Sequence, residues 1–116
     1  MKGPLAAAKY QLAAVNDLSN GWFGGGGAGG PAFSAVDKII FATDTATAVP
    51  KGGLSLARRQ LAGVNDATNG WFGGGNPGTV STVDKIIFAT DTATLVAKGP
   101  LSQGRERLSA CQASNN

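Results

Sequence analysis

The stretch Leu61-Ala-Gly-Val-Asn-Asp-Ala-Thr-Asn-Gly-Trp-Phe-Gly-Gly-Gly75 decides the fold, because it occurs twice. Its other copy, residues 12–26, is identical at 12 of 15 positions. A second block, Val83-Asp-Lys-Ile-Ile-Phe-Ala-Thr-Asp-Thr-Ala-Thr-Leu-Val96, repeats residues 36–49 with 13 of 14 positions identical. The copies lie 49 residues apart in the first block and 47 apart in the second. A period near 50 residues predicts a repeat architecture in which each unit packs on the next.

A third block opens each unit and occurs three times. Residues 2–15 match residues 51–64 at eight of 14 positions, and residues 98–111 match residues 51–64 at six of 14. The chain is therefore expected to divide into a first unit at 2–50, a second at 51–97, an extra copy of the opening segment at 98–112 and a tail at 113–116.

Composition excludes several classes of protein. Of the 116 residues, 42% are hydrophobic and only 15% are charged, which argues against a disordered chain despite 18 glycines. The absence of histidine and the single cysteine exclude most metal-site and histidine-based chemistry. The net charge of +3 is scattered along the chain, so we expect no nucleic-acid partner. No stretch approaches the roughly 20 apolar residues of a membrane helix, so we expect no membrane insertion, and the cellular location stays open.

Each unit is expected to form four short strands. In the second unit they are predicted at residues 60–64, 70–74, 83–89 and 93–96, with a hairpin turn at Asn69-Gly70 and another turn at residues 90–92. In the third strand of the first unit, Ile39 and Phe41 point one way and Ile40 the other, so both faces are apolar. Sheets arranged around an axis bury both faces, which is the geometry of a propeller.

The order of these motifs resembles a kelch repeat. The matching features are Arg58-x-x-Leu-Ala-x-Val64, Gly70-Trp-Phe-Gly-Gly74, Val83-Asp-Lys-Ile-Ile-Phe88 and Lys98-Gly-Pro-Leu-Ser102. The resemblance covers residues 2–112 and implies an all-β fold of propeller blades, each with four antiparallel strands. The sequence departs from the kelch pattern in one respect, because the tryptophan that usually closes the fourth strand is replaced by valine.

The resemblance also bears on function. Enzymatic kelch relatives such as copper radical oxidases need histidine ligands, so their activity and cofactor are not implied, and no cofactor is expected. The Phe-Gly-Gly-Gly repeats are similar to those of bacteriophage tail and surface proteins, which implies a virion or surface component. We therefore predict a non-enzymatic module with a structural or binding role, whose partner is a second copy of itself, a glycan or another virion or surface protein.

Two blades alone would leave two apolar outer faces exposed. We therefore expect homo-oligomerisation, with a trimer giving six blades, unless the chain is a fragment of a longer propeller. The strands expected to mediate assembly contain Leu12 and Val15 in the first copy of the opening block and Leu108 and Cys111 in the third. The third copy is the most degenerate, so we expect it to be displaced by the next chain or to form a strand at the rim.

Candidate ligand-binding residues fall into two groups. Trp22 and Trp71 are of the kind that stacks on sugars, although a repeated strand position equally suits packing between blades. The cations that recur in the opening block, Lys51, Lys98, Arg58 and Arg105, would attract an anion or an acidic partner, or else bond to the backbone between blades.

The sequence also bears on three other functions. A glycan-binding lectin would place its sites in the variable connections at 27–35 and 76–82. The glycine runs match a dinucleotide fingerprint by letter, but a strand follows them where the fingerprint needs a helix. An enzyme with an acidic site on the axis is the remote alternative, because the chain offers no pair of nucleophile and base. We expect no metal, since turn chemistry accounts for the aspartates.

Overall fold

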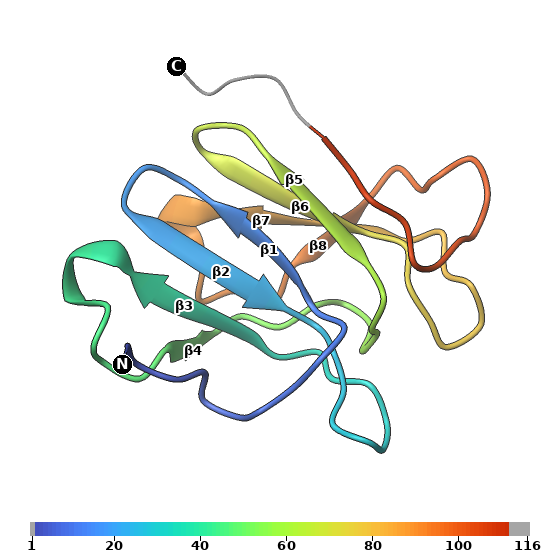
Figure 1. The fold of residues 1–116 in the computed structure, drawn as a ribbon. Helices are drawn as coiled ribbons and strands as arrows, with labels where there is room; N and C mark the ends of the chain where they lie inside the picture. Colours follow the sequence, from blue (N-terminus) through green and yellow to red (C-terminus); the bar gives the residue numbers. More distant parts are fainter. Residues whose placement is uncertain (1, 112–116) are drawn as a thin grey trace.

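A computed structural model describes residues 2–111 and shows an all-β chain (Figure 1). Two four-stranded antiparallel sheets follow one another along the sequence. The first sheet contains, in spatial order, β1 (Ala13–Asn16), β2 (Asn20–Gly24), β3 (Val36–Ile40) and β4 (Val49–Lys51). The second contains β5 (Ala62–Asn65), β6 (Asn69–Gly73), β7 (Val83–Ile87) and β8 (Val96–Lys98). The predicted all-β class and the two units of four antiparallel strands are thus confirmed.

The third strand of each unit is shorter than predicted. β7 ends at Ile87, and a 3₁₀ turn, η2 (Phe88–Thr90), follows it; η1 (Phe41–Thr43) follows β3 in the same way. The amide of Phe88 donates to the carbonyl of Thr68, 3.0 Å away in the preceding hairpin, and the pairing of β7 with β8 is confined to residues 83–85 and 96–98. The fourth strand thus lies at Val96–Lys98 instead of the predicted 93–96.

The prediction of a hairpin turn at Asn69-Gly70 is wrong. Both residues belong to β6, and neither has a positive φ. The turn lies just before them and is closed by Asp66, whose Oδ1 accepts from the amides of Thr68 at 2.9 Å and Asn69 at 2.8 Å. A side-chain cap of this kind forms the turn without left-handed residues.

The core of the chain lies between the two sheets. β1 contacts β5 and β6, and Figure 1 shows the two sheets side by side with their first strands adjacent. We call this packing of the first sheet on the second the junction. Its buried side chains come from both sheets and from the segment that links them: Val15, Trp22, Val36, Leu54, Leu61, Phe72, Ile86, Phe88 and Leu95.

Lys98, the first residue of the extra copy of the opening block, is the last residue of β8, and the copy forms no strand within residues 99–111. It runs along the second sheet, with the carbonyl of Arg105 accepting from Gly75 at 2.8 Å and the amide of Arg107 donating to Gln60 at 2.9 Å. The predicted end of this copy at residue 112 and the tail at 113–116 lie outside the described residues. No helix within residues 2–111 is long and apolar enough to cross a membrane.

The Asp66 turn makes part of the stability depend on pH. The two backbone amides hold the pKa of the Asp66 carboxyl below its ordinary value in the folded chain. The contribution is therefore complete above about pH 4 and is lost as the pH falls through the lower, folded-state pKa. We expect Asp66→Asn, which keeps an oxygen acceptor but cannot ionise, to lose less stability on acidification than the unmodified chain. Urea unfolding at about pH 6 and about pH 2.5 measures this; equal losses in both proteins would contradict it.

Candidate functional site

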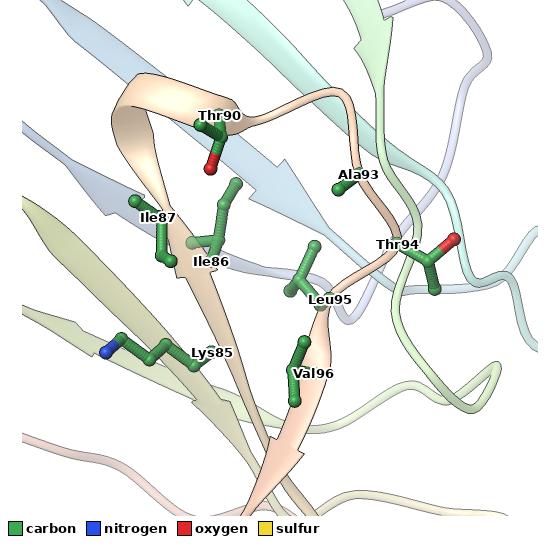
Figure 2. A pocket seen from close by; sticks show the side chains of 8 residues that line it. All are labelled: Lys85, Ile86, Ile87, Thr90, Ala93, Thr94, Leu95 and Val96. Carbon is green, nitrogen blue, oxygen red and sulfur yellow. The ribbon is translucent and has the colours of Figure 1, made fainter.

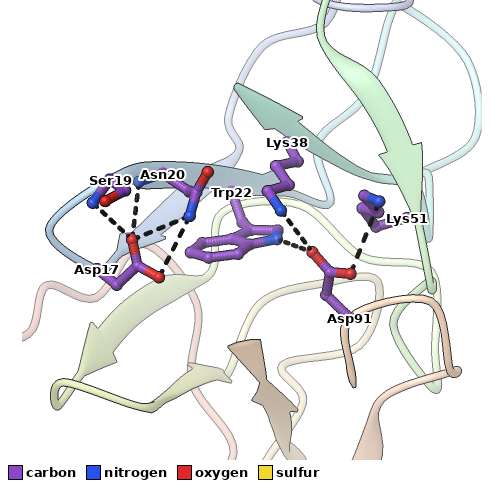
Figure 3. A network of polar contacts seen from close by, with 7 residues as sticks. All are labelled: Asp17, Ser19, Asn20, Trp22, Lys38, Lys51 and Asp91. Carbon is purple, nitrogen blue, oxygen red and sulfur yellow. Dashed lines mark hydrogen bonds and ion pairs between the residues drawn. The ribbon is translucent and has the colours of Figure 1, made fainter. Parts of the chain in front are cut away.

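Trp22 anchors the junction from the first sheet. Its ring stacks on Phe88 of η2 in the second unit, with centroids 4.2 Å apart and planes 4° from parallel. Its indole nitrogen donates to Asp91 Oδ2 at 2.9 Å (Figure 3). The same carboxylate lies 3.5 Å from the Lys38 Nζ and 3.7 Å from the Lys51 Nζ. The indole, the carboxylate and the two ammonium groups thus join β2, β3, β4 and the loop before β8.

A buried ion pair forms the second anchor. Arg58 lies in the segment linking the sheets, has no exposed surface, and its Nη1 approaches Asp84 Oδ2 at 3.1 Å. Asp84 also accepts from the Ser55 hydroxyl at 2.6 Å and from the Ser55 amide at 3.0 Å. The second guanidinium nitrogen donates to the carbonyl of Phe72 at 2.8 Å. Burial lowers the pKa of Arg58, and the Asp84 charge opposes that shift.

The sheets interlock through one aromatic side chain. Phe72 of β6 is fully buried and lies over Gly24 of β2, where an added Cβ would come within 3.0 Å of the ring. Asn65 completes the contact, because its amide accepts from the backbone nitrogen of Asn16 at 3.2 Å and donates to the carbonyl of Asn16 at 2.6 Å. A glycine at position 24 therefore makes room for the partner ring.

The repeat places a second set of these side chains on the outer faces of the chain. Trp71 corresponds to Trp22 but is only half-buried, on the face of the second sheet that points away from the first. Phe41 corresponds to Phe88 and is 47% exposed on the first sheet. Lys85 lies over the Trp71 ring at 5.9 Å, as Lys38 lies over Trp22 at 5.4 Å.

A hollow marks the place where the second sheet lacks a neighbour. It has a volume of about 110 Å³ and lies over Gly73, the counterpart of Gly24. Unlike Gly24, Gly73 has no ring above it, and an added Cβ would meet nothing closer than 3.5 Å. The lining is almost wholly apolar and includes Ala62, Val64, Trp71, Val83, Leu101 and Leu108.

The structure brings Trp22, Lys51 and Arg58 together at the junction and places the other predicted site residues elsewhere. Trp22 and Arg58 are buried in the junction, so the ring face of Trp22 is covered by Phe88. Lys51 faces Asp91, while Lys98 and Arg105 are exposed on the second unit. Among the strand residues expected to mediate assembly, Val15 is buried in the junction, Leu12 and Leu108 are half-buried, and Cys111 is exposed.

Other hollows are poorer candidates for a ligand. A pocket of about 50 Å³ between β7 and the loop before β8 is lined mainly by aliphatic groups (Figure 2) and is far below the roughly 300–1,000 Å³ of ligand sites. An open hollow of about 380 Å³ lies near Asp17, Asn20 and Thr68. Its carboxylate is already bonded to Ser19 and Asn20 of its own turn (Figure 3).

The glycine runs and the aspartates do not form a phosphate site or a metal site within residues 2–111. The amides of Gly25 and Gly26 donate to the carbonyls of Ala35 and Arg58, so they are not available to a phosphate. Within residues 2–111, no cluster of three or more carboxylate or thiol side chains is suited to a metal ion. No protein-family model matches the chain, and no curated protein does so either.

We expect the junction to be strongly destabilised when only one partner of the buried Arg58–Asp84 pair is removed. Replacing Arg58 by Met leaves the Asp84 carboxylate buried without its cation, which costs about 3–5 kcal/mol. The double variant Arg58→Met, Asp84→Asn removes that stranded charge and should recover a large part of the loss. Urea unfolding of the two single variants and the double variant forms a double-mutant cycle. Additive effects would show that the two side chains do not act as a pair.

Proposed function

We propose that this chain is a non-enzymatic, kelch-like propeller module that assembles with further copies of itself by repeating the junction between chains. One observation carries the proposal: the two outer faces of the chain bear the two complementary halves of the junction. Trp22, Phe72 and Phe88 are buried at the junction, whereas their counterparts Trp71 and Phe23 are half-buried and Phe41 is exposed.

The polar half of the junction has its counterpart too. The outer face of the first sheet carries Phe41 and Asp44 at the positions of Phe88 and Asp91. A second copy placed against the second sheet would stack its Phe41 on Trp71 and accept the indole N–H with its Asp44. The indole donor of Trp71 would then have the partner that Trp22 has within the chain.

The hollow over Gly73 supports the same arrangement. Phe72 covers Gly24 in the junction, and Phe23 is its counterpart in the first sheet. Phe23 of a second copy would therefore cover Gly73 and fill the apolar hollow. Burying a phenylalanine that is otherwise partly exposed contributes up to about 1.5–3 kcal/mol per contact.

The two faces differ from each other, so the contact is head to tail and generates a ring when its rotation closes. A trimer would give six blades, which lies within the four to eight of known propellers. The role we propose for the ring is structural or binding, on a virion or another surface, because the residues offer a repeated packing face and no catalytic set.

Assembly is tested by the mass of the protein in solution together with two alanine variants. An added Cβ at Gly73 meets only ordinary contacts in the single chain but occupies the place proposed for Phe23 of the next copy. We expect light scattering to show a trimer for the unmodified chain, and Gly73→Ala to weaken association about tenfold or more while the fold is kept.

Gly30→Ala is the matched control, because nothing lies within 4 Å of the added Cβ and φ is not positive. We expect it to associate as the unmodified chain does. A protein that stays at 11.6 kDa at all concentrations would overturn the proposed assembly. Oligomers that are indifferent to Gly73→Ala would show a contact elsewhere.

A glycan-binding role is the second candidate, and Trp71 is the residue that favours it. Its half-buried ring lies on the open face, whereas Trp22 is covered. The two roles exclude each other at this residue, because a ring buried by a second copy cannot stack on a sugar. A glycan array in which binding is lost with Trp71→Ala would support the lectin, and an array with no binding would remove it.

A further inference from the structure

Three related segments of the chain differ in how many sheets they bond to. They are the N-terminal segment (residues 2–9), the linking segment (51–58) and the C-terminal segment (98–105). The linking segment lies between the two sheets and bonds to both, whereas each of the others has a sheet on one side only. Each of the two outer segments therefore lacks the bonds to a sheet that the other one makes, and a contact between copies could supply them.

The linking segment shows the full set. Towards the first sheet, the carbonyl of Arg58 accepts from Gly26 at 2.9 Å and the amide of Leu54 donates to Ser34 at 2.8 Å. Towards the second sheet, the amide of Gly52 donates to Asp91 at 2.8 Å. Arg58 and Ser55 then bind Asp84 of that sheet through their side chains.

The C-terminal segment makes only the bonds to the sheet that precedes it in the chain. The carbonyl of Arg105 accepts from Gly75 at 2.8 Å, and the amide of Leu101 donates to Ser81 at 2.8 Å. Its Arg105 side chain is exposed and, among residues 2–111, donates only to the carbonyl of Gln103, 3.3 Å away. Within residues 2–111 no carboxylate is paired with it, although Asp84 is paired with its counterpart Arg58.

The N-terminal segment makes only the bonds to the sheet that follows it in the chain. The amide of Gly3 donates to the carbonyl of Asp44 at 2.7 Å, as Gly52 donates to Asp91. Lys9 takes the place of Arg58, with its Nζ 3.5 Å from Asp37 Oδ2. If the junction repeats between copies, the C-terminal segment of one chain and the N-terminal segment of the next must occupy the same space.

The Asp37 carboxylate can be bound by either the N-terminal segment of its own chain or the C-terminal segment of another copy, and the two offer it different donors. The N-terminal segment offers it Ala6 and Lys9, and the 1% exposed Lys9 side chain has no hydrogen-bond partner for its Nζ within the described residues. The C-terminal segment offers Ser102 and Arg105, the same pair of residue types that binds Asp84 through Ser55 and Arg58. Serine and arginine supply directed donors where alanine supplies none and lysine supplies a single ammonium group.

The sequence also shows where one copy should give way to the other. Residues 98–105 match the linking segment at five of eight positions and residues 2–9 at four of eight. In the strand that follows, residues 10–15 match residues 59–64 at four of six positions, whereas residues 106–111 match at one of six. Residues 98–105 thus resemble the linking segment more than residues 2–9 do, whereas residues 10–15 resemble the start of the second unit's first strand more than residues 106–111 do.

We propose that the contact between copies is a segment exchange. Residues 98–105 of one copy replace residues 2–9 of the next, Arg105 and Ser102 bind Asp37, and β1 of the next copy keeps its place while residues 106–111 move aside. This inference rests on the proposed self-assembly and adds the residues that hold it. Lys9 serves as a provisional partner that keeps Asp37 neutralised until the exchange.

Point variants of the full chain test the exchange. Arg105→Gln should weaken association about 10- to 100-fold, the loss expected for a hydrogen bond between charged groups, without changing the fold of the single chain. Arg107→Gln is the matched control, since it removes a neighbouring exposed arginine in favour of the residue found at position 60. It should change association by less than about twofold.

A double variant in the N-terminal segment distinguishes the two competing segments by the direction in which association changes. Ala6→Ser with Lys9→Arg gives the N-terminal segment the same residue types as the linking segment. It should compete better for Asp37 and weaken association about tenfold. If the N-terminal segment instead holds the contact, this variant strengthens association and Arg105→Gln has no effect, which would overturn the exchange while leaving the assembly intact.

Amine acetylation followed by mass spectrometry reports the exchange directly. Lys9 is buried in the single chain and should react slowly there, whereas in the oligomer fraction it should react as fast as Lys2, whose side chain is 69% exposed. Protection of Lys9 in both fractions would overturn the exchange. Absence of any oligomer overturns the proposed assembly and the exchange with it.

Discussion

The Arg58–Asp84 ion pair is the constraint on which the rest of the junction depends. A fully buried cation is tolerated only next to an anion and a set of acceptors, and here these lie on the second sheet while the backbone of Arg58 bonds to the first. The pair therefore fixes the spacing between two sheets that share no strand. The apolar packing of Trp22 on Phe88 and of Phe72 over Gly24 follows from that spacing.

The repeat gives near-identical residues different surroundings. Trp22 and Trp71 have the same neighbours along the chain, yet one is covered by Phe88 and the other borders an apolar hollow. The difference comes from position in the order of sheets and not from local sequence. The position of each unit in the chain therefore decides which of its faces is covered and which stays open.

The all-β class, the two four-strand units and their order could be predicted from the sequence, because repeat periodicity and β-branched runs are local signals. The hairpin was misjudged because Asn69-Gly70 is a strong turn signal by propensity, whereas Asp66 closes the turn earlier with its side chain. The positive φ values of Gln11, Gln60 and Arg107 have no signature in residue type. The pairing of Arg58 with Asp84 joins residues 26 positions apart, and no local pattern encodes it.

The covalent link between the two sheets has a consequence for how an assembly would come apart. Inside one chain, the short linking segment holds the sheets at a high effective concentration, so the internal junction does not depend on how dilute the protein is. A contact of the same chemistry between chains lacks that tether and obeys mass action. Dilution would thus release intact pairs of sheets and never single ones, making the pair the unit of exchange between rings.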